Sequence, residues 1–110
     1  MGKQKTFDEY DFLDLFYQEM LEQGQASNLI RLTVDARMVE GIYDKSGISV
    51  TEDDLQRMAD NCLANSWVKH TTQDVGQYGN LQLTTTGFGV AKTKRKQAEQ
   101  LNNRNVVKKI

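Results

Sequence analysis

The sequence predicts a single, mainly α-helical domain with a small β-hairpin. Apolar residues recur at the helical period over Leu55–Leu63, directly after a capping sequence at Thr51. Two short segments of β-type composition, Trp67–Thr71 and Leu81–Thr84, flank a polar stretch that contains glycine and asparagine. The chain has 110 residues and no proline, which fits one domain of helices with short connections.

The first helix is expected to begin at a capping box of Thr6 and Glu9 and to stop at Gly24, with residues 1–5 disordered before it. Its apolar positions cover more than one face. Such a helix either lies beneath other elements on two sides or packs against a second subunit. The second alternative makes the aromatic residues of this helix a candidate homodimer face, consisting of Phe7, Phe12 and Phe16.

Two shorter elements are expected before the clearest helix. Leu29–Leu32 is a candidate strand between polar loop residues. Thr33 is the candidate N-cap of a second helix, which extends to about Asp44 and is ended by Lys45–Gly47. The inward positions of this second segment are Val34, Met38, Val39 and Ile42.

The third helix has the strongest local signals. Thr51 is its expected N-cap, and Asp54 stands at the third helical position, close to a capping box. Val50 and Leu55 occupy the two positions of a hydrophobic staple. Cys62 falls on the apolar face of this helix, so we interpret it as a core thiol and not as a nucleophile.

The C-terminal part predicts a hairpin followed by a long helix. Trp67 is expected to fill the core between the hairpin and the helices. The last helix should run from Thr84 to about Asn103, with Gly87 and Gly89 where its first turn crosses another element closely. A single domain is therefore expected over residues 6–103, followed by a basic, frayed tail over residues 104–110.

This element order is helix, strand, helix, helix, strand, wing, strand, helix. Together with Leu63-Ala-Asn-Ser-Trp67-Val and Leu81-Gln-Leu-Thr-Thr-Thr-Gly87, it resembles the winged helix-turn-helix domains of small bacterial regulators such as the MarR and PadR families. The resemblance covers roughly residues 29–91 and singles out neither family. It implies that residues 51–87 contain the recognition helix and the wing.

The resemblance also implies a DNA-binding transcriptional regulator that dimerises. In such proteins the exposed face of the third helix enters the major groove of duplex DNA. Glutamine and asparagine side chains can read adenine there, and arginine can read guanine. The residues expected on this face are Asp53, Gln56, Arg57, Asp60, Asn61 and Ala64.

The distribution of charge favours a different ligand, a protein partner. Residues 1–60 carry thirteen acidic and six basic residues, and the expected wing, Thr72–Asn80, has Asp74 and no lysine or arginine. Affinity for DNA depends largely on cationic contacts with phosphates, so DNA is possible but disfavoured. Tyr78 on the wing either contacts the ligand or folds back on the hairpin.

Basic residues gather near the C-terminus instead. One interpretation is a solvated helix end, and the other is a phosphate-binding tail for nucleic acid or an anionic membrane surface. No helix-ending signal such as Gly or Pro precedes Ile110, which raises the hypothesis of a longer, membrane-associated protein. The basic residues are Lys92, Lys94, Arg95, Lys96, Arg104, Lys108 and Lys109.

No pattern of residues predicts catalysis, a metal site or a cofactor. The single histidine, His70, and the single cysteine have no carboxylate cluster beside them in the sequence. Catalytic triads and glycine-rich phosphate loops are absent from the sequence, so we expect no enzymatic activity. One cysteine, no signal peptide and no apolar run of membrane-spanning length favour a cytoplasmic location.

Overall fold

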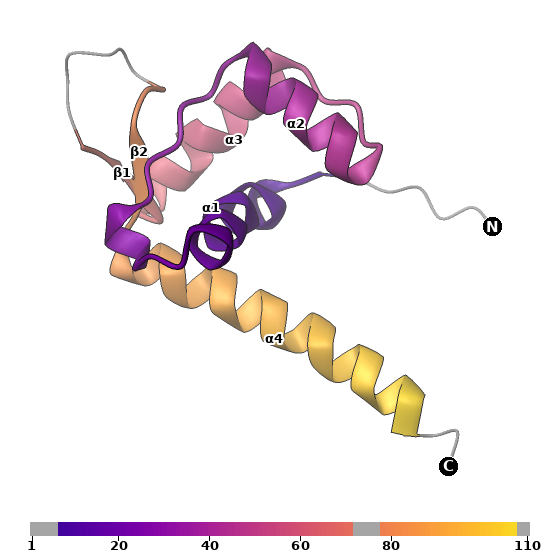
Figure 1. Ribbon diagram of the computed structural model, residues 1–110. Coiled ribbons are helices and arrows are strands. Elements are labelled where there is room, and N and C mark those ends of the chain that lie inside the picture. The colour runs from indigo at the N-terminus through magenta and orange to yellow at the C-terminus, as the bar shows by residue number, and fades with distance from the viewer. Residues whose placement is uncertain (1–6, 72–77, 108–110) are drawn as a thin grey trace.

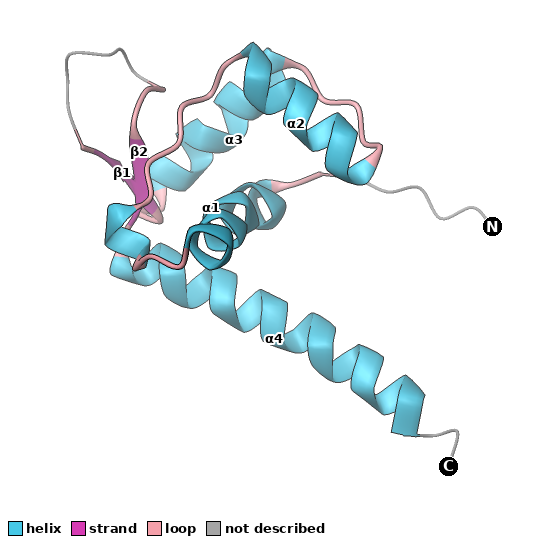
Figure 2. Cartoon of the chain, viewed as in Figure 1, coloured by secondary structure: helices cyan, strands magenta, loops and turns pink. Residues whose placement is uncertain are grey.

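The computed structural model describes residues 7–71 and 78–107, with the side chains of residues 7–71 and 78–98. The described chain is mainly helical with one antiparallel hairpin, as predicted (Figures 1 and 2). Residues 1–5, predicted to be disordered, lie outside the described residues. The elements are α1 (Glu9–Gln23), the short 3-10 helix η1 (Ser27–Leu29), α2 (Ala36–Ser46), α3 (Glu52–Ala64), β1 (Val68–His70), β2 (Leu81–Leu83) and α4 (Thr85–Val107).

The N-cap of helix α1 lies two residues later in the sequence than the N-cap that was predicted. Its N-cap is Asp8, whose carboxylate accepts from the Asp11 amide at 3.0 Å, while the Asp11 carboxylate accepts from the Asp8 amide at 3.0 Å. Glu9 is therefore the first helical residue, and Thr6, the predicted N-cap, lies outside the described residues. The end of the helix is as predicted, because Gly24 adopts the left-handed conformation with φ 64°.

The aromatic residues of α1 form the core of the single chain. Phe12 and Phe16 are 0% and 1% exposed, and their rings pack edge to face with centroids 5.7 Å apart. Helix α1 contacts both α3 and α4, so it lies beneath other elements on two sides. The dimer face predicted from Phe7, Phe12 and Phe16 is therefore wrong for the two buried rings, and Phe7 is half-buried against the same core.

The segment before α2 is not the strand predicted over Leu29–Leu32. Leu29 ends η1, and only Leu32 pairs, in an isolated bridge with Leu81 whose two N–H···O bonds measure 2.9 and 2.8 Å. Thr33 does not cap α2, because its hydroxyl accepts from the Asn80 amide at 2.9 Å. Asp35 takes the capping role instead and accepts from the Arg37 and Met38 amides.

Helix α3 is as the sequence predicts. Thr51 and Asp54 form a reciprocal capping box, with distances of 3.0 and 3.1 Å. The predicted apolar face is buried: Leu55, Ala59 and Cys62 have no exposed area. Such a helix has one fixed inner face, and its opposite face is consequently fixed toward solvent.

The hairpin pairs Val68 with Leu83 and His70 with Leu81, and α4 follows it directly. A Cβ atom on Gly87 would lie 1.8 Å from the carbonyl oxygen of Trp67, so the close crossing predicted in this turn is confirmed. At Gly89 the same atom would meet nothing within 4 Å. Helix α4 packs against α1 and continues to Val107, past the end predicted near Asn103, so that its C-terminal part projects beyond the other helices (Figure 1). In the described part of the chain, no helix is long and apolar enough to cross a membrane.

Candidate functional site on helix α3

The exposed strip of α3 is the candidate site and consists of Asp53, Arg57, Asp60 and Ala64. These residues follow one another at intervals of three and four, so they share one face of the helix. All of them are exposed, and they lie opposite the buried face that contains Leu55. Gln56, which was also predicted as a contact residue, is half-buried at the side of this strip.

The charge of α3 is strongly negative. The helix carries Glu52, Asp53, Asp54 and Asp60 against the single cation Arg57. Arg57 is already paired, because its Nη2 lies 3.0 Å from Oδ1 of Asp54. The Thr51 amide, and after it Arg57, hold the pKa of the Asp54 carboxyl below its usual value of 3.8. The exposed strip therefore presents the Asp53 and Asp60 carboxylates without an unpaired cation on the same helix.

Asn61 is drawn to the side of the strip by helix α1. Its Nδ2 donates to Oε2 of Glu9 at 2.6 Å, and its backbone carbonyl accepts from Nδ2 of Asn65. The Asn61 amide thus joins α3 to the first residue of α1. A side chain held in this way is not oriented to read the edge of a base, which an adenine contact requires.

Tyr78 is turned onto helix α3, whereas the sequence left open a ligand contact or a fold back on the hairpin. Its hydroxyl donates to both oxygens of the Asp60 carboxylate at 3.1 Å, and its carbonyl accepts from the Val34 amide at 2.9 Å. Partial burial, together with this hydrogen bond and the negative charge of Asp60, raises the pKa of Tyr78 above its usual 10.0. The end of the hairpin is therefore fastened to α3 and to the segment before α2.

The basic residues predicted as a tail have mixed roles in the structure. The Arg95 guanidinium pairs with Asp14, with Nε 2.9 Å from Oδ1, and lies 4.9 Å from the Tyr17 ring centroid. Lys94 lies 4.6 Å from the ring centroid of Tyr10, so it also packs α4 on α1. Lys92 and Lys96 are exposed, and the Arg104 backbone is helical, although its side chain is not described.

The geometry around the single cysteine argues against nucleophilic chemistry. Cys62 has no exposed area, and burial, with a smaller effect of the Glu9 charge, raises its pKa to about 12. The neutral thiol is consequently the only form near neutral pH. In residues 7–71 and 78–98, no group of three or more His, Cys, Asp or Glu side chains is placed to hold a metal ion.

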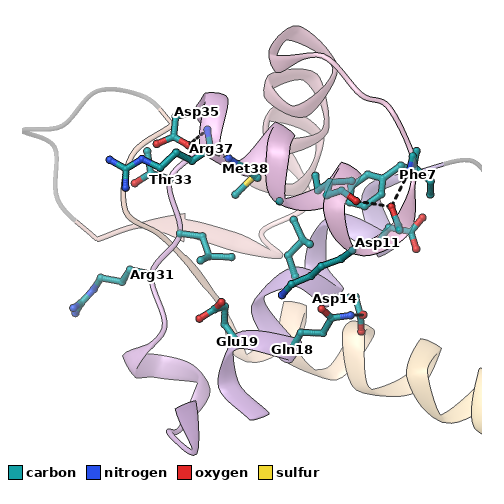
Figure 3. A pocket seen from close by; sticks show the side chains of 17 residues that line it. Phe7, Asp11, Asp14, Gln18, Glu19, Arg31, Thr33, Asp35, Arg37 and Met38 are labelled. Atoms are coloured by element: carbon teal, nitrogen blue, oxygen red, sulfur yellow. Dashed lines mark hydrogen bonds between the residues drawn. The ribbon is translucent and has the colours of Figure 1, made fainter. Parts of the chain in front are cut away.

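A second surface feature, the α1–α2 groove, was not predicted from the sequence. It is a hollow of about 610 Å³ between α1 and α2 (Figure 3). Its apolar floor consists of half-buried and buried aliphatic side chains, and charged side chains stand at its rim. The sequence pointed to this groove only indirectly, because the apolar positions of α1 cover more than one face of the helix. The floor residues are Leu15, Leu32, Met38, Ile42 and Ile48.

No protein-family model, curated protein or solved structure matches the chain. A function therefore has to be inferred from the exposed strip and the groove themselves.

Proposed function

We propose that the chain is a winged helix-turn-helix domain that binds a protein partner through the exposed strip of α3. The order of α2, α3, the hairpin and α4 supports the domain type. The Leu32–Leu81 bridge supports it further, because it holds the segment before α2 beside β2 of the hairpin. Fold alone does not decide between DNA and protein as the ligand, so the side chains of the strip carry the rest of the proposal.

The negative charge of the exposed strip is the observation that favours a protein. Asp53 and Asp60 are exposed, and the cation between them, Arg57, is paired with Asp54. DNA phosphates are repelled by such a surface, since affinity for DNA depends on phosphate neutralisation by cations. A partner that presents lysine or arginine is attracted to it, and complementary charge raises the association rate and the specificity of the complex.

One carboxylate of the strip and a residue beside it are also ordered before any partner arrives. Asp60 is bound by the Tyr78 hydroxyl, and the neighbouring Asn61 is bound by Glu9. Side chains that are already ordered lose less conformational entropy on binding, and this increases affinity for a given contact area. A rigid acidic strip fits recognition of a partner surface with correspondingly fixed cations.

Duplex DNA is the second candidate, and one observation favours it. The Arg57 side chain is 65% exposed, so it can exchange Asp54 for a guanine edge, and Lys69 is exposed on the hairpin for a phosphate. This candidate predicts retardation of duplex DNA in a gel at low salt, with steep weakening as salt is added and loss in Arg57→Ala. The protein-binding proposal predicts no retardation under the same conditions.

Affinity capture from extracts of the native host tests the proposal. The tagged protein, Asp53→Lys and the control Asp44→Lys are compared by quantitative mass spectrometry. Asp44 is also an exposed helical aspartate, on α2, so the control changes net charge by the same amount. We expect a partner that the protein and the control retain and that Asp53→Lys loses at least tenfold. Equal recovery with all three proteins contradicts the strip as the binding surface.

A further inference from the structure

We propose that the α1–α2 groove binds an amphipathic helix of a partner protein, with basic residues on the edge facing α1 and acidic residues on the edge facing Arg31 and Arg37. This surface is separate from the exposed strip of α3. The inference goes beyond the function proposed above and does not depend on it.

The apolar floor of the groove is the first observation. Leu15, Leu32, Met38 and Ile48 pack against the core but remain half-buried, whereas Ile42 beneath them is 3% exposed. Several large aliphatic side chains therefore meet solvent inside one hollow. The volume of this hollow is about 610 Å³. Apolar surface gathered in a hollow in this way is typical of a binding site.

The two walls of the groove carry opposite charge. Asp11, Asp14 and Glu19 line the α1 side, and Arg31 and Arg37 stand on the other side (Figure 3). Asp14 is paired with Arg95. The carboxylates of Asp11 and Glu19 accept from the Asp8 amide and the Gln23 side chain, but among the described residues neither has a cation within ion-pair distance. Among the described residues, neither Arg31 nor Arg37 lies within ion-pair distance of a carboxylate.

Two other charged side chains that line the groove already have partners within the chain. Asp35 is the acidic exception on the arginine side, and its carboxylate caps α2. Lys45 lines the groove and lies 3.5 Å from Glu22 of α1, with both side chains more than half exposed. An exposed pair of this kind stabilises the protein little, so it does not prevent a partner from competing for either charge.

The arrangement suits a helix better than a small molecule. Small-molecule pockets use a few buried polar groups to orient the ligand, and no buried side-chain nitrogen or oxygen of the described residues lacks a partner. An apolar centre with a charged rim is the anatomy of a protein interface. Two helices forming the walls match the helix-in-groove mode, in which apolar residues at i, i+4 and i+7 enter the hollow.

The state of Asp11 supports a cationic edge on the α1 side. Burial is the main cause that raises the pKa of this carboxyl above 3.8; the hydrogen bond from the Asp8 amide lowers it, and the negative charges of Asp8 and Asp14 raise it further. A lysine or arginine seated beside it would offset this by favouring the charged form.

A displayed helix library tests the inference directly. One helix of a small three-helix scaffold is randomised at its exposed positions and selected against the protein. We expect binders that converge on an apolar stripe with basic residues along one edge and acidic residues along the other. These binders should lose at least tenfold in affinity for Met38→Glu and retain it for Tyr43→Glu, which changes an exposed residue of α2 outside the groove.

A charge reversal that leaves the floor intact provides the second readout. The double variant Glu19→Lys/Arg37→Glu should prefer scaffold helices in which the acidic and basic edges are exchanged. Circular dichroism of each variant establishes that it is folded. Absence of binders, binders that ignore Met38→Glu, or an unchanged edge preference in the double variant each overturns the inference. None of these variants touches Asp53, Arg57 or Asp60, so failure here and failure of the α3 proposal are distinguishable.

Discussion

The hydroxyl of Tyr78 donates to both oxygens of the Asp60 carboxylate, at 3.1 Å each, and joins the end of the hairpin to the exposed strip of α3. The same residue accepts from the Val34 amide through its carbonyl, at 2.9 Å. The hairpin, helix α3 and the segment before α2 are thus connected at one point. A change in the charge of Asp60 or Tyr78 is expected to affect the order of this whole corner.

Removal of the Tyr78 hydroxyl should destabilise the protein only below strongly alkaline pH. The pKa of Tyr78 is raised in the folded protein, so the folded state favours the neutral phenol more than the unfolded chain does. The stabilisation is complete below the unfolded pKa of about 10 and is lost as pH rises through the higher folded pKa. Thermal midpoints of the protein and Tyr78→Phe, measured from pH 7 to 11, should differ at pH 7 and converge at the alkaline end. A difference that stays constant across this range would show that the hydroxyl does not titrate with the Asp60 contact.

Gly87 and Gly89 form a matched pair for helix α4. Alanine at Gly87 places its Cβ atom 1.8 Å from the Trp67 carbonyl oxygen, so α4 must shift, and we expect a loss of about 1–3 kcal/mol. Alanine at Gly89 meets nothing within 4 Å. It should stabilise the helix by about 0.5–1 kcal/mol, because alanine favours helical backbone more than glycine. Urea unfolding of both variants measures the two changes, and equal effects would contradict the close crossing at Trp67.

The Cys62 thiol should not react with thiol reagents until the protein unfolds. The thiol has no exposed area, and burial raises its pKa to about 12. At pH 8 we expect its reaction with Ellman's reagent to be slower than in the urea-unfolded chain by roughly a thousandfold or more, because reaction waits for unfolding. Rapid reaction in native buffer would mean that α3 does not hold this side chain in the core.

The Asp14–Arg95 pair should contribute measurably to the attachment of α4 to α1. The guanidinium makes two contacts with the carboxylate, at 2.9 and 3.2 Å, and the side chains are 27% and 32% exposed. A double-mutant cycle with Asp14→Asn and Arg95→Gln should give a coupling free energy of about 1 kcal/mol in urea unfolding. Because Arg95 also lies over Tyr17, Arg95→Ala should cost more than Arg95→Gln. A coupling free energy near zero would assign Arg95 to the solvated face of α4 instead.

Local signals in the sequence were sufficient for α3 and for most helix ends. Thr51 and Asp54 satisfy each other within one turn, and Gly24 and Gly47 end α1 and α2 at positive φ. The predicted start of α1 was wrong because Thr6–Glu9 and Asp8–Asp11 are overlapping candidates for a capping box. Each offers the same reciprocal bonds, so the local sequence does not choose between them.

The remaining errors concern contacts between residues that are distant in the sequence. Thr33 was expected to cap a helix, but its hydroxyl is used by Asn80, 47 residues later. Asn61, predicted as a contact residue, also donates its side-chain amide to Glu9, 52 residues earlier, which the sequence did not indicate. The α1–α2 groove has the same origin, because it exists only where two separate helices fail to close on each other. Periodicity and capping describe single elements and contain no information about such pairs.

Photo-cross-linking from Ala64 tests most directly whether the exposed strip of α3 binds a protein. Ala64 is exposed at the end of the exposed strip of α3. Tyr43, which is 57% exposed on α2, is the control position. A benzoylphenylalanine at each position is activated in cells of the native host, with and without Asp53→Lys. We predict a discrete protein adduct from Ala64 that Asp53→Lys abolishes and that Tyr43 does not form. An Ala64 adduct with DNA, or a protein adduct unaffected by Asp53→Lys, would contradict recognition of a protein by the acidic strip.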